Sequence, residues 1–205
     1  MEYIVAMQNP TPIALVTLAA VIACWIFFAC IFIFRKKQQP QSEAKRDRWS
    51  FAGIFLQMCA YGLVWFQPPH SAFLPPLPVL SGAFGLALSV FAVGIAVASV
   101  WFVAAAVRTL GRQWTYAARL IEGHKLITEG PYSVVRNPIY TGMFGMLIAT
   151  GLALEHWIAL LIAIPLFIAG LVIRVRSEEK LLRSVFGQEF EEYAKRVSAV
   201  IPGVY

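Results

Sequence analysis

Two short stretches of the chain carry residue types and spacings that can do chemistry. One is GPYSVVRNPIYTG, residues 130–142, which sets an arginine, an amide and two tyrosines among tight turns. The other is RVRSEEKLLRSVF, residues 174–186, where Arg174 and Glu178 stand four residues apart and so share one helix face. A guanidinium can hold a carboxylate, and a carboxylate can accept a hydrogen bond from a ligand. The alternative is an ordinary solvated ion pair.

The first stretch also predicts where a helix begins. Pro138 suits the first helical turn, where its missing N–H removes no hydrogen bond, and Asn137 before it is a typical N-cap. The free N–H groups of that turn are satisfied either by the chain itself or by a ligand carboxylate. Glycines at positions 111, 123 and 130 would let the backbone approach a ligand closely.

Composition indicates that membrane helices position these stretches. Of the 205 residues, 59% are hydrophobic and 14% are charged, whereas a soluble domain carries about 25% charged residues. A spanning helix needs roughly 20 apolar residues. Runs near that length predict the following spans: Pro12–Phe34, Ser50–Phe66, Val79–Val107, Pro138–Leu154 and Trp157–Ile173. Only Glu155 and His156 are polar between the last two, which predicts a tight helical hairpin.

The distribution of positive charge predicts the orientation of the spans. The net charge is +6, and all 17 Lys and Arg residues fall in the segments after the first, third and fifth spans. The N-terminal segment, the proline-rich loop at residues 67–78 and the turn between the last two spans have none. The positive-inside rule then places the N-terminus outside and the C-terminus in the cytoplasm. This explains the basic balance without a nucleic-acid partner, and it turns both chemical stretches toward the cytoplasm.

The sequence thus predicts an all-α, polytopic membrane protein with about five transmembrane helices. Residues 1–109 form the first three spans, and residues 110–205 form a cytoplasmic loop, the last two spans and a C-terminal amphipathic helix. Apolar residues at steps of 3 and 4 predict that helix; they are Leu182, Phe186, Phe190, Tyr193 and Val197. The helix is expected on the membrane surface or against the inner loop, with a break at Gly187.

Several function classes lack a motif. Cys24, Cys30 and Cys59 lie in apolar runs without a CxxC pair, which indicates apolar packing and neither a metal site nor a disulfide. The chain has no GxSxG, HExxH, GxxxxGKS or GxGxxG motif, so serine hydrolases, zinc proteases and common nucleotide-binding folds have no support. No metal is predicted. No predicted span contains a charged residue, which disfavours an ion or proton pathway.

The order GHKLITEGPYSVVRNPIYTG, a tight hairpin, RVRSEEKLL, FGQEFEEYAKRV and IPG resembles the isoprenylcysteine carboxyl methyltransferase family. The wider relatives of that family include the phospholipid methyltransferases. The resemblance covers about half the chain, from Leu110 to the C-terminus. It implies an integral membrane enzyme that binds S-adenosylmethionine on its cytoplasmic side and receives a lipophilic substrate from the bilayer.

The resemblance also implies residue roles. Arg174 would hold the substrate. Apart from the resemblance, an amine substrate would need a base, and a glutamate such as Glu179 could serve as one. Asn137 stands where the family usually has histidine; an amide keeps a donor and an acceptor but cannot titrate. The implied cofactor-binding residues are His124, Lys125, Leu126, Ile127, Tyr132, Arg136, Asn137, Pro138, Ile139, Tyr140 and Glu178.

Alternatives stay open. A carboxylate acceptor needs no base and suits Arg174, whereas an amine acceptor such as a phospholipid headgroup must lose a proton. Membrane sterol reductases, which use NADPH, resemble the C-terminal half of the chain and its ending, Ile201–Tyr205. A non-catalytic membrane scaffold would need none of these side chains.

Overall fold

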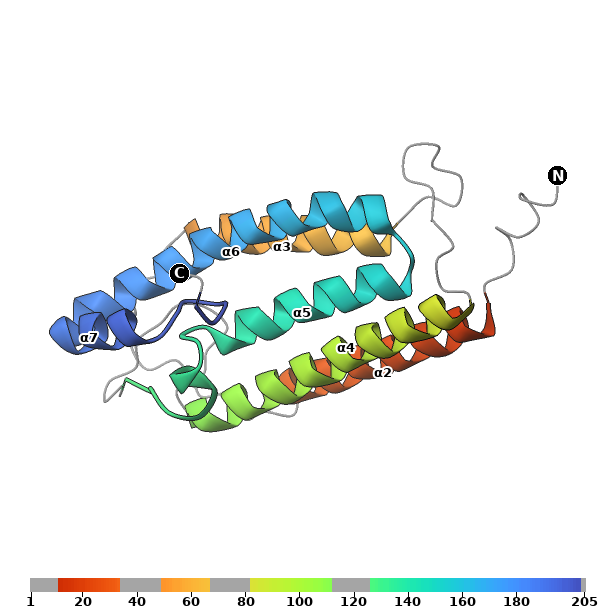
Figure 1. Cartoon of the computed structure of the whole chain (residues 1–205). Coiled ribbons are helices and arrows are strands. Elements are labelled where there is room, and N and C mark those ends of the chain that lie inside the picture. The colour runs from red at the N-terminus through yellow and green to blue at the C-terminus, as the bar shows by residue number, and fades with distance from the viewer. Residues whose placement is uncertain (1–10, 34–48, 67–81, 112–125, 204–205) are drawn as a thin grey trace.

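The computed structural model describes residues 11–33, 49–66, 82–111 and 126–203, and these are helical throughout apart from short connections. The predicted all-α fold is confirmed for this part of the chain (Figure 1). Its elements are α2 (Pro12–Ile33), α3 (Trp49–Trp65), α4 (Gly82–Leu110), the 3-10 turn η2 (Gly130–Ser133), α5 (Pro138–Ala153), α6 (Trp157–Phe186) and α7 (Gln188–Arg196).

The apolar helices have the surface of a multi-pass membrane protein. Helices α2, α4 and α6 are long and apolar enough to cross a membrane, and α3 and α5 are shorter apolar helices. Large hydrophobic side chains remain exposed on the outer faces of the bundle, as with Phe55 and Trp101 at 68% and 70% exposure. Soluble proteins rarely expose contiguous apolar surface on this scale, whereas lipid would cover it.

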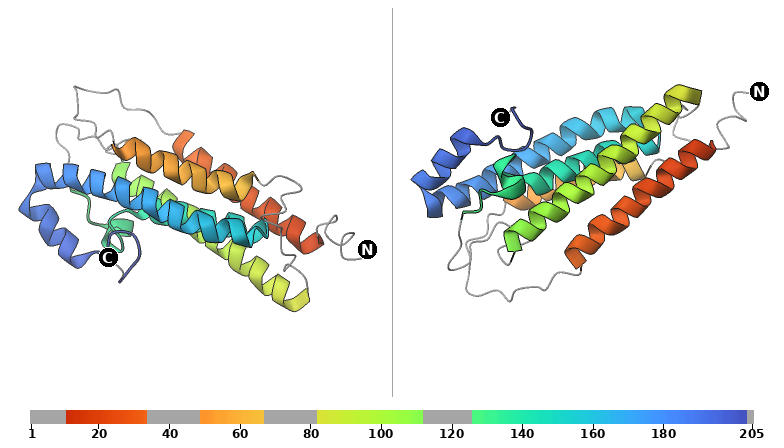
Figure 2. Two further views of the ribbon diagram at one scale, coloured as in Figure 1. Left: turned by 90° about the horizontal axis from the view of Figure 1, so that it is seen from above. Right: turned by 60° about the horizontal axis from the view of Figure 1, so that its bottom comes forward.

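Helix α5 is the shared wall of the bundle. It contacts each of the other four apolar helices, with α3 and α6 side by side above it and α4 and α2 below it (Figures 1 and 2). One buried cluster, around Leu147 and Phe167, joins α3, α5 and α6. A second, around Val103 and Met146, joins α2, α4 and α5. Helix α5, which begins at Pro138, is therefore held from both sides.

Helix boundaries follow the apolar runs closely, with one large difference. The helix predicted to begin at Pro138 does so, and the first two spans end within one residue of the prediction. Helix α6 begins at Trp157 but continues to Phe186, 13 residues beyond the predicted end of the span. Between Ile173 and Gly187 the chain has no glycine or proline to end a helix. Gly187, with φ of +48°, makes the predicted break.

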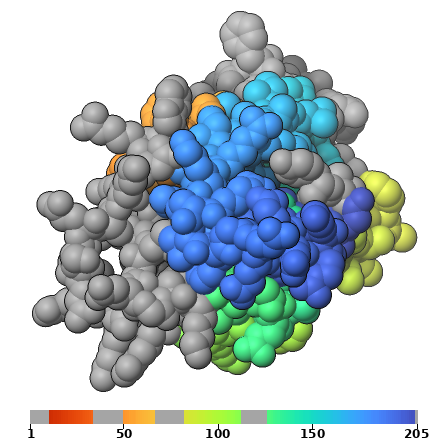
Figure 3. Space-filling model, turned by 90° about the vertical axis from the view of Figure 1, so that its left-hand side faces the viewer, coloured from red at the N-terminus to blue at the C-terminus, as the bar shows by residue number. Residues whose placement is uncertain are grey.

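The C-terminal stripe packs against the inner loop, one of its two predicted positions. Phe190 and Tyr193 on α7 are buried, whereas the part of the stripe on α6 is half-buried. The Tyr193 hydroxyl donates a hydrogen bond of 2.6 Å to the carbonyl of Tyr132 in η2. Burial raises the pKa of Tyr193 to about 12, so this hydroxyl stays a donor at neutral pH. Figure 3 shows α7 and the end of α6 beside the η2 segment at this end of the molecule.

A pair of glycines lets α3 and α6 touch backbone to backbone. A Cβ built on Gly53 would lie 2.7 Å from the Gly170 carbonyl oxygen, and one built on Gly170 would lie 2.6 Å from the Gly53 oxygen. Both distances are too short for real atoms, so only glycine fits at either position. One helical turn beyond each glycine come Gln57 and Arg174, so this contact sets the separation of those two side chains.

We predict that Gly53→Ala destabilises the protein by about 1–3 kcal/mol, because the new methyl group must push α3 away from α6. Gly62→Ala in the same helix is the control, because a Cβ there meets nothing within 4 Å. It should be neutral or stabilising by about 0.5–1 kcal/mol. Thermal unfolding in detergent measures both, and equal midpoints for the two variants would contradict the proposed close contact.

Candidate active site

A chain of polar contacts crosses the apolar bundle where α5 begins. The Tyr140 hydroxyl donates a hydrogen bond to the Glu178 carboxylate. The Arg174 guanidinium lies over the Tyr140 ring, with Cζ 4.5 Å from the ring centroid. Its Nη1 donates a hydrogen bond of 3.1 Å to Oε1 of Gln57 on α3. Residues from α3, α5 and α6, as far apart in sequence as positions 57 and 178, thus form one cluster.

Arg174 and Glu178 share a helix face as predicted and form a long ion pair, but the pair is largely shielded from solvent. Arg174 is only 9% exposed. Its Nη2 lies 4.0 Å from Glu178 Oε1, which exceeds hydrogen-bonding distance. The Glu178 side chain is 26% exposed, and its second oxygen has no hydrogen-bond partner among the described residues. This carboxylate therefore keeps an acceptor for a ligand.

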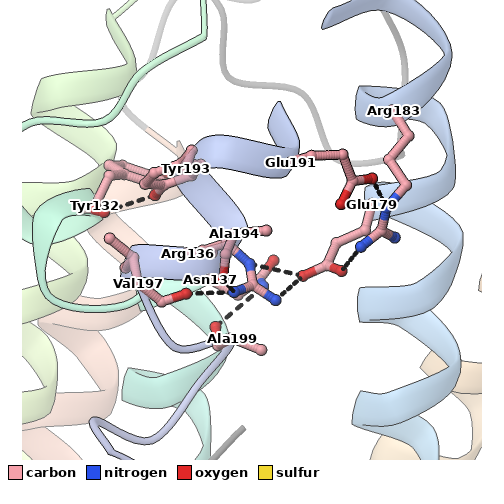
Figure 4. A network of polar contacts seen from close by, with 10 residues as sticks. All are labelled: Tyr132, Arg136, Asn137, Glu179, Arg183, Glu191, Tyr193, Ala194, Val197 and Ala199. Carbon is pink, nitrogen blue, oxygen red and sulfur yellow. Dashed lines mark hydrogen bonds and ion pairs between the residues drawn. The ribbon is translucent and has the colours of Figure 1, made fainter. Parts of the chain in front are cut away.

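A second network holds the loop before α5 against α6 and α7 (Figure 4). Nε and Nη2 of Arg136 both donate to Glu179 Oε1, at 2.9 and 2.7 Å. Arg136 Nη1 donates to the carbonyls of Ala194 and Val197 at the end of α7. The other Glu179 oxygen lies 3.2 Å from Arg183 Nη2. Both side chains of the Arg136–Glu179 pair are under 10% exposed, so these contacts use nearly all of their polar atoms.

The C-terminal segment clamps Asn137 from the side. The backbone N–H groups of Arg136 and Asn137 donate to the carbonyls of Ser198 and Ala199 at 2.8 and 2.9 Å. The Asn137 side-chain nitrogen donates to the Ala199 carbonyl as well, at 3.1 Å. Asn137 does occupy the N-cap position, but its side chain makes no capping hydrogen bond, so that part of the prediction is wrong. Its side-chain oxygen has no partner within the described residues and points to no helix N–H.

The remaining predicted cofactor residues are at least partly buried where the structure describes them. Tyr132 is buried beneath α7, and Pro138 is fully buried at the start of α5. Ile139, Leu126 and Ile127 are half-buried. His124 and Lys125 fall in the segment 112–125, which lies outside the described residues.

Sequence reasoning missed Gln57. It is 2% exposed in the middle of α3, where it bonds to Arg174. The available signal was a lone amide in an otherwise apolar run, which in a membrane helix must face the bundle interior to find a partner.

Residues 87–189, about half of the chain, match the phospholipid methyltransferase family. The chain belongs to this family. The matched segment contains Tyr140, Arg174 and Glu178 but not Gln57.

Three relatives illustrate its range. Protein-S-isoprenylcysteine O-methyltransferase B of Arabidopsis thaliana is 35% identical over 104 residues, which is 48% of this chain and 51% of the relative. Protein-S-isoprenylcysteine O-methyltransferase of Schizosaccharomyces pombe is 33% identical over 86 residues, 42% of this chain and 36% of the relative. Nickel-cobalt-cadmium resistance protein NccN of Alcaligenes xylosoxydans xylosoxydans is 33% identical over 113 residues, 54% of this chain and 52% of the relative.

The chain spans about half the length of the curated relatives it matches. Within its described residues, no three His, Cys, Asp or Glu side chains are grouped so that they could hold a metal ion.

We predict that Glu179→Gln loosens α7, because it leaves the buried guanidinium of Arg136 without its counter-charge. Breaking a buried ion pair on one side costs about 3–5 kcal/mol. Hydrogen exchange at residues 188–200 should therefore become faster, while α3 and α4 stay protected. Glu189→Gln on the exposed face of α7 is the control and should leave exchange unchanged. Equal hydrogen exchange in the two variants would contradict the role of the Arg136–Glu179 pair in holding α7.

Proposed function

We propose that the protein is an integral membrane methyltransferase that moves a methyl group from S-adenosylmethionine to a lipophilic acceptor. The acceptor group is a carboxylate such as that of an isoprenylcysteine. The family membership supports the reaction class, and the cluster of Tyr140, Arg174 and Glu178 carries the assignment of the site. Residues 110–205 form the methyltransferase core in this proposal.

The residues present fit the cofactor. S-adenosylmethionine carries an ammonium group, hydroxyls and an adenine amine, all hydrogen-bond donors. The unpaired oxygens of Glu178 and Asn137 are acceptors of the kind such donors need. We assign the cofactor to these two side chains, with Tyr140 holding Glu178 in place. The predicted contacts from Leu126, Ile127, Tyr132 and Ile139, and from the undescribed His124 and Lys125, complete the proposed pocket.

Arg136 and Pro138, also predicted as cofactor residues, have a supporting role in this proposal. Arg136 already donates to Glu179 and to two carbonyls, so in this proposal it holds the loop before α5 in place and does not contact the cofactor. Pro138 starts α5 and so sets the direction in which Tyr140 points.

Arg174 supplies the charge for the acceptor. When bound, S-adenosylmethionine would supply a methyl group on a positively charged sulfur; a carboxylate oxygen would bond to that methyl without releasing a proton, and the sulfur would keep the electron pair of the broken bond as a neutral thioether. The Arg174 guanidinium can orient the carboxylate by charge and hydrogen bonds. The Tyr140 ring covers one face of the guanidinium and limits its contact with water. The role left to the protein is alignment of the two reactants.

No base is needed for a carboxylate, and we propose that Glu179 is not one. Both of its oxygens are paired with guanidinium groups, from Arg136 and Arg183. Neither oxygen is therefore left free to take a proton from a substrate amine. In this proposal Glu179 positions Arg136 and does not act as the general base that an amine acceptor would need.

The proposed topology has five spans, with the N-terminus outside and the active site facing the cytoplasm. It rests on the charge distribution, since every Lys and Arg lies in the segments after spans one, three and five. A lipophilic acceptor could then reach Arg174 directly from the bilayer, between helices whose outer faces are apolar.

A phospholipid amine is the second candidate acceptor, because the matched family carries phospholipid methyltransferase as its description. An amine must lose a proton, and its ammonium form is repelled by Arg174. These two points favour the carboxylate.

We predict that Glu178→Gln weakens S-adenosylmethionine binding about 10- to 100-fold, the effect of losing hydrogen bonds to a charged acceptor. Calorimetry on the full chain in detergent measures it. Glu192→Gln on exposed α7 is the control. NADPH as a competitor tests the reductase alternative. Unchanged affinity in Glu178→Gln, or displacement by NADPH, would remove the basis for the assigned cofactor site.

We also predict the methyl acceptor. Labelled methyl groups should appear as base-labile esters when the protein receives S-farnesylcysteine with a free carboxylate or a fatty acid. Phosphatidylethanolamine should remain unlabelled, because its ammonium group lacks a base and faces Arg174. Label on the phospholipid alone would shift the assignment to the amine methyltransferase.

A further inference from the structure

Two buried arginines in this protein are used differently. The Nε and Nη2 atoms of an arginine form the edge of the guanidinium that meets a carboxylate in parallel hydrogen bonds. In Arg136 both atoms of that edge donate to Glu179. In Arg174 neither does: Nε is buried with no partner in the described part of the chain, and Nη2 stays 4.0 Å from Glu178.

The other sides of the Arg174 guanidinium are occupied. Nη1 donates to Gln57 Oε1 at 3.1 Å, and the Tyr140 ring covers one face. The aliphatic stem of Arg174 packs on Gly53, where any Cβ would collide with it. The guanidinium is therefore held at one end and on one face, with its carboxylate-binding edge uncommitted.

Gln57 brings a second unused donor to the same place. Its Nε2 is buried and also lacks a partner within the described residues. It belongs to the carboxamide whose oxygen binds Arg174, so it lies next to the guanidinium. A buried donor without an acceptor costs about 1–3 kcal/mol. Two such donors on side chains that are hydrogen-bonded to each other, on residues 2% and 9% exposed, indicate that an anionic ligand completes the site.

We propose that Gln57 is a positioning residue that presents the Nε–Nη2 edge of Arg174 to the acceptor carboxylate and adds its own amide N–H to it. The identity of the acceptor rests on the proposed function, but the anion-binding arrangement does not. Gln57 lies on α3, outside the segment that matches the family, so the N-terminal half of the chain takes part in acceptor selection.

The arrangement also accounts for product release. Methylation turns the carboxylate into a neutral ester, which loses its charge and one acceptor oxygen suited to the Arg174 edge. The site should therefore bind the acid more tightly than the ester. This preference is a property of binding and can be measured without methyl transfer.

The test compares N-acetyl-S-farnesylcysteine with its methyl ester, as ligands of the full chain in detergent without a methyl donor. We expect the wild-type protein to bind the acid at least ~10-fold more tightly than the ester. Gln57→Met keeps the shape of the side chain without its polar atoms and should reduce that ratio to about 3 or less. Gln57→Glu adds a negative charge and should abolish the preference for the acid.

Differences in micelle partitioning belong to the ligands and cancel when variants are compared. Ser89→Ala is the matched control, because Ser89 is a buried polar residue of α4 whose hydroxyl also has no partner in the described part of the chain. It should keep the wild-type ratio. Size-exclusion profiles identify any variant that is misfolded. If Gln57→Met is misfolded, the acid-to-ester ratio of Gln57→Glu tests the inference in its place.

An unchanged acid-to-ester ratio in the Gln57 variants would overturn the inference. Equal weakening of acid and ester would overturn it too, because that is the result of a structural role alone. Labelled-methyl transfer is measured separately on the wild-type protein. Its absence beside an intact acid preference would refute the proposed function and leave the anion site standing.

Discussion

Arg174 carries a positive charge into a bundle whose interior is mostly apolar, and much of the local structure compensates for that charge. A buried charge costs several kcal/mol unless it is paired and hydrogen-bonded. Gln57, the Tyr140 ring and Glu178 supply partial compensation from three helices. That compensation needs α3 and α6 in backbone contact at Gly53 and Gly170. The close packing of α3 on α6 is thus also a condition for the polar contacts of the site.

The two polar networks divide the work at this end of the molecule. In the network of Arg136, Glu179 and Arg183 all three nitrogens of the Arg136 guanidinium and both Glu179 oxygens have partners, and the network joins the loop before α5 to α6 and α7. The network of Glu178, Tyr140 and Arg174 is incompletely paired and joins α6 to α5 and, through Gln57, to α3. Saturated pairs give rigidity, whereas unsaturated groups keep affinity for a ligand. Adjacent glutamates on one helix belong to different networks because successive residues point about 100° apart.

Much of the fold could be predicted from the sequence, because apolar runs, glycines and prolines act locally. The start of α5 at Pro138 and the break at Gly187 follow from backbone chemistry at single residues. The pairing of Arg174 with Gln57, 117 residues away, could not be predicted, since no periodicity encodes which helices become neighbours. The same holds for the clamp of Ser198 and Ala199 on Asn137, which took over a side chain predicted to cap the helix.

The charges in the site favour a carboxylate acceptor over an amine, because a carboxylate pairs with the buried positive charge of Arg174. Glu178 offers a negative charge to a cationic cofactor. The Nε–Nη2 edge of Arg174 is positively charged, so a cationic cofactor does not pair with it. A carboxylate at that edge would give every buried charge a partner and satisfy the Nε and Gln57 donors together. An amine would leave both donors without acceptors and add a like charge beside Arg174, at a cost that grows as water is excluded. Gln57 and Arg174 together thus form a site suited to binding an anion in apolar surroundings. The affinity of this site falls once the bound group becomes neutral.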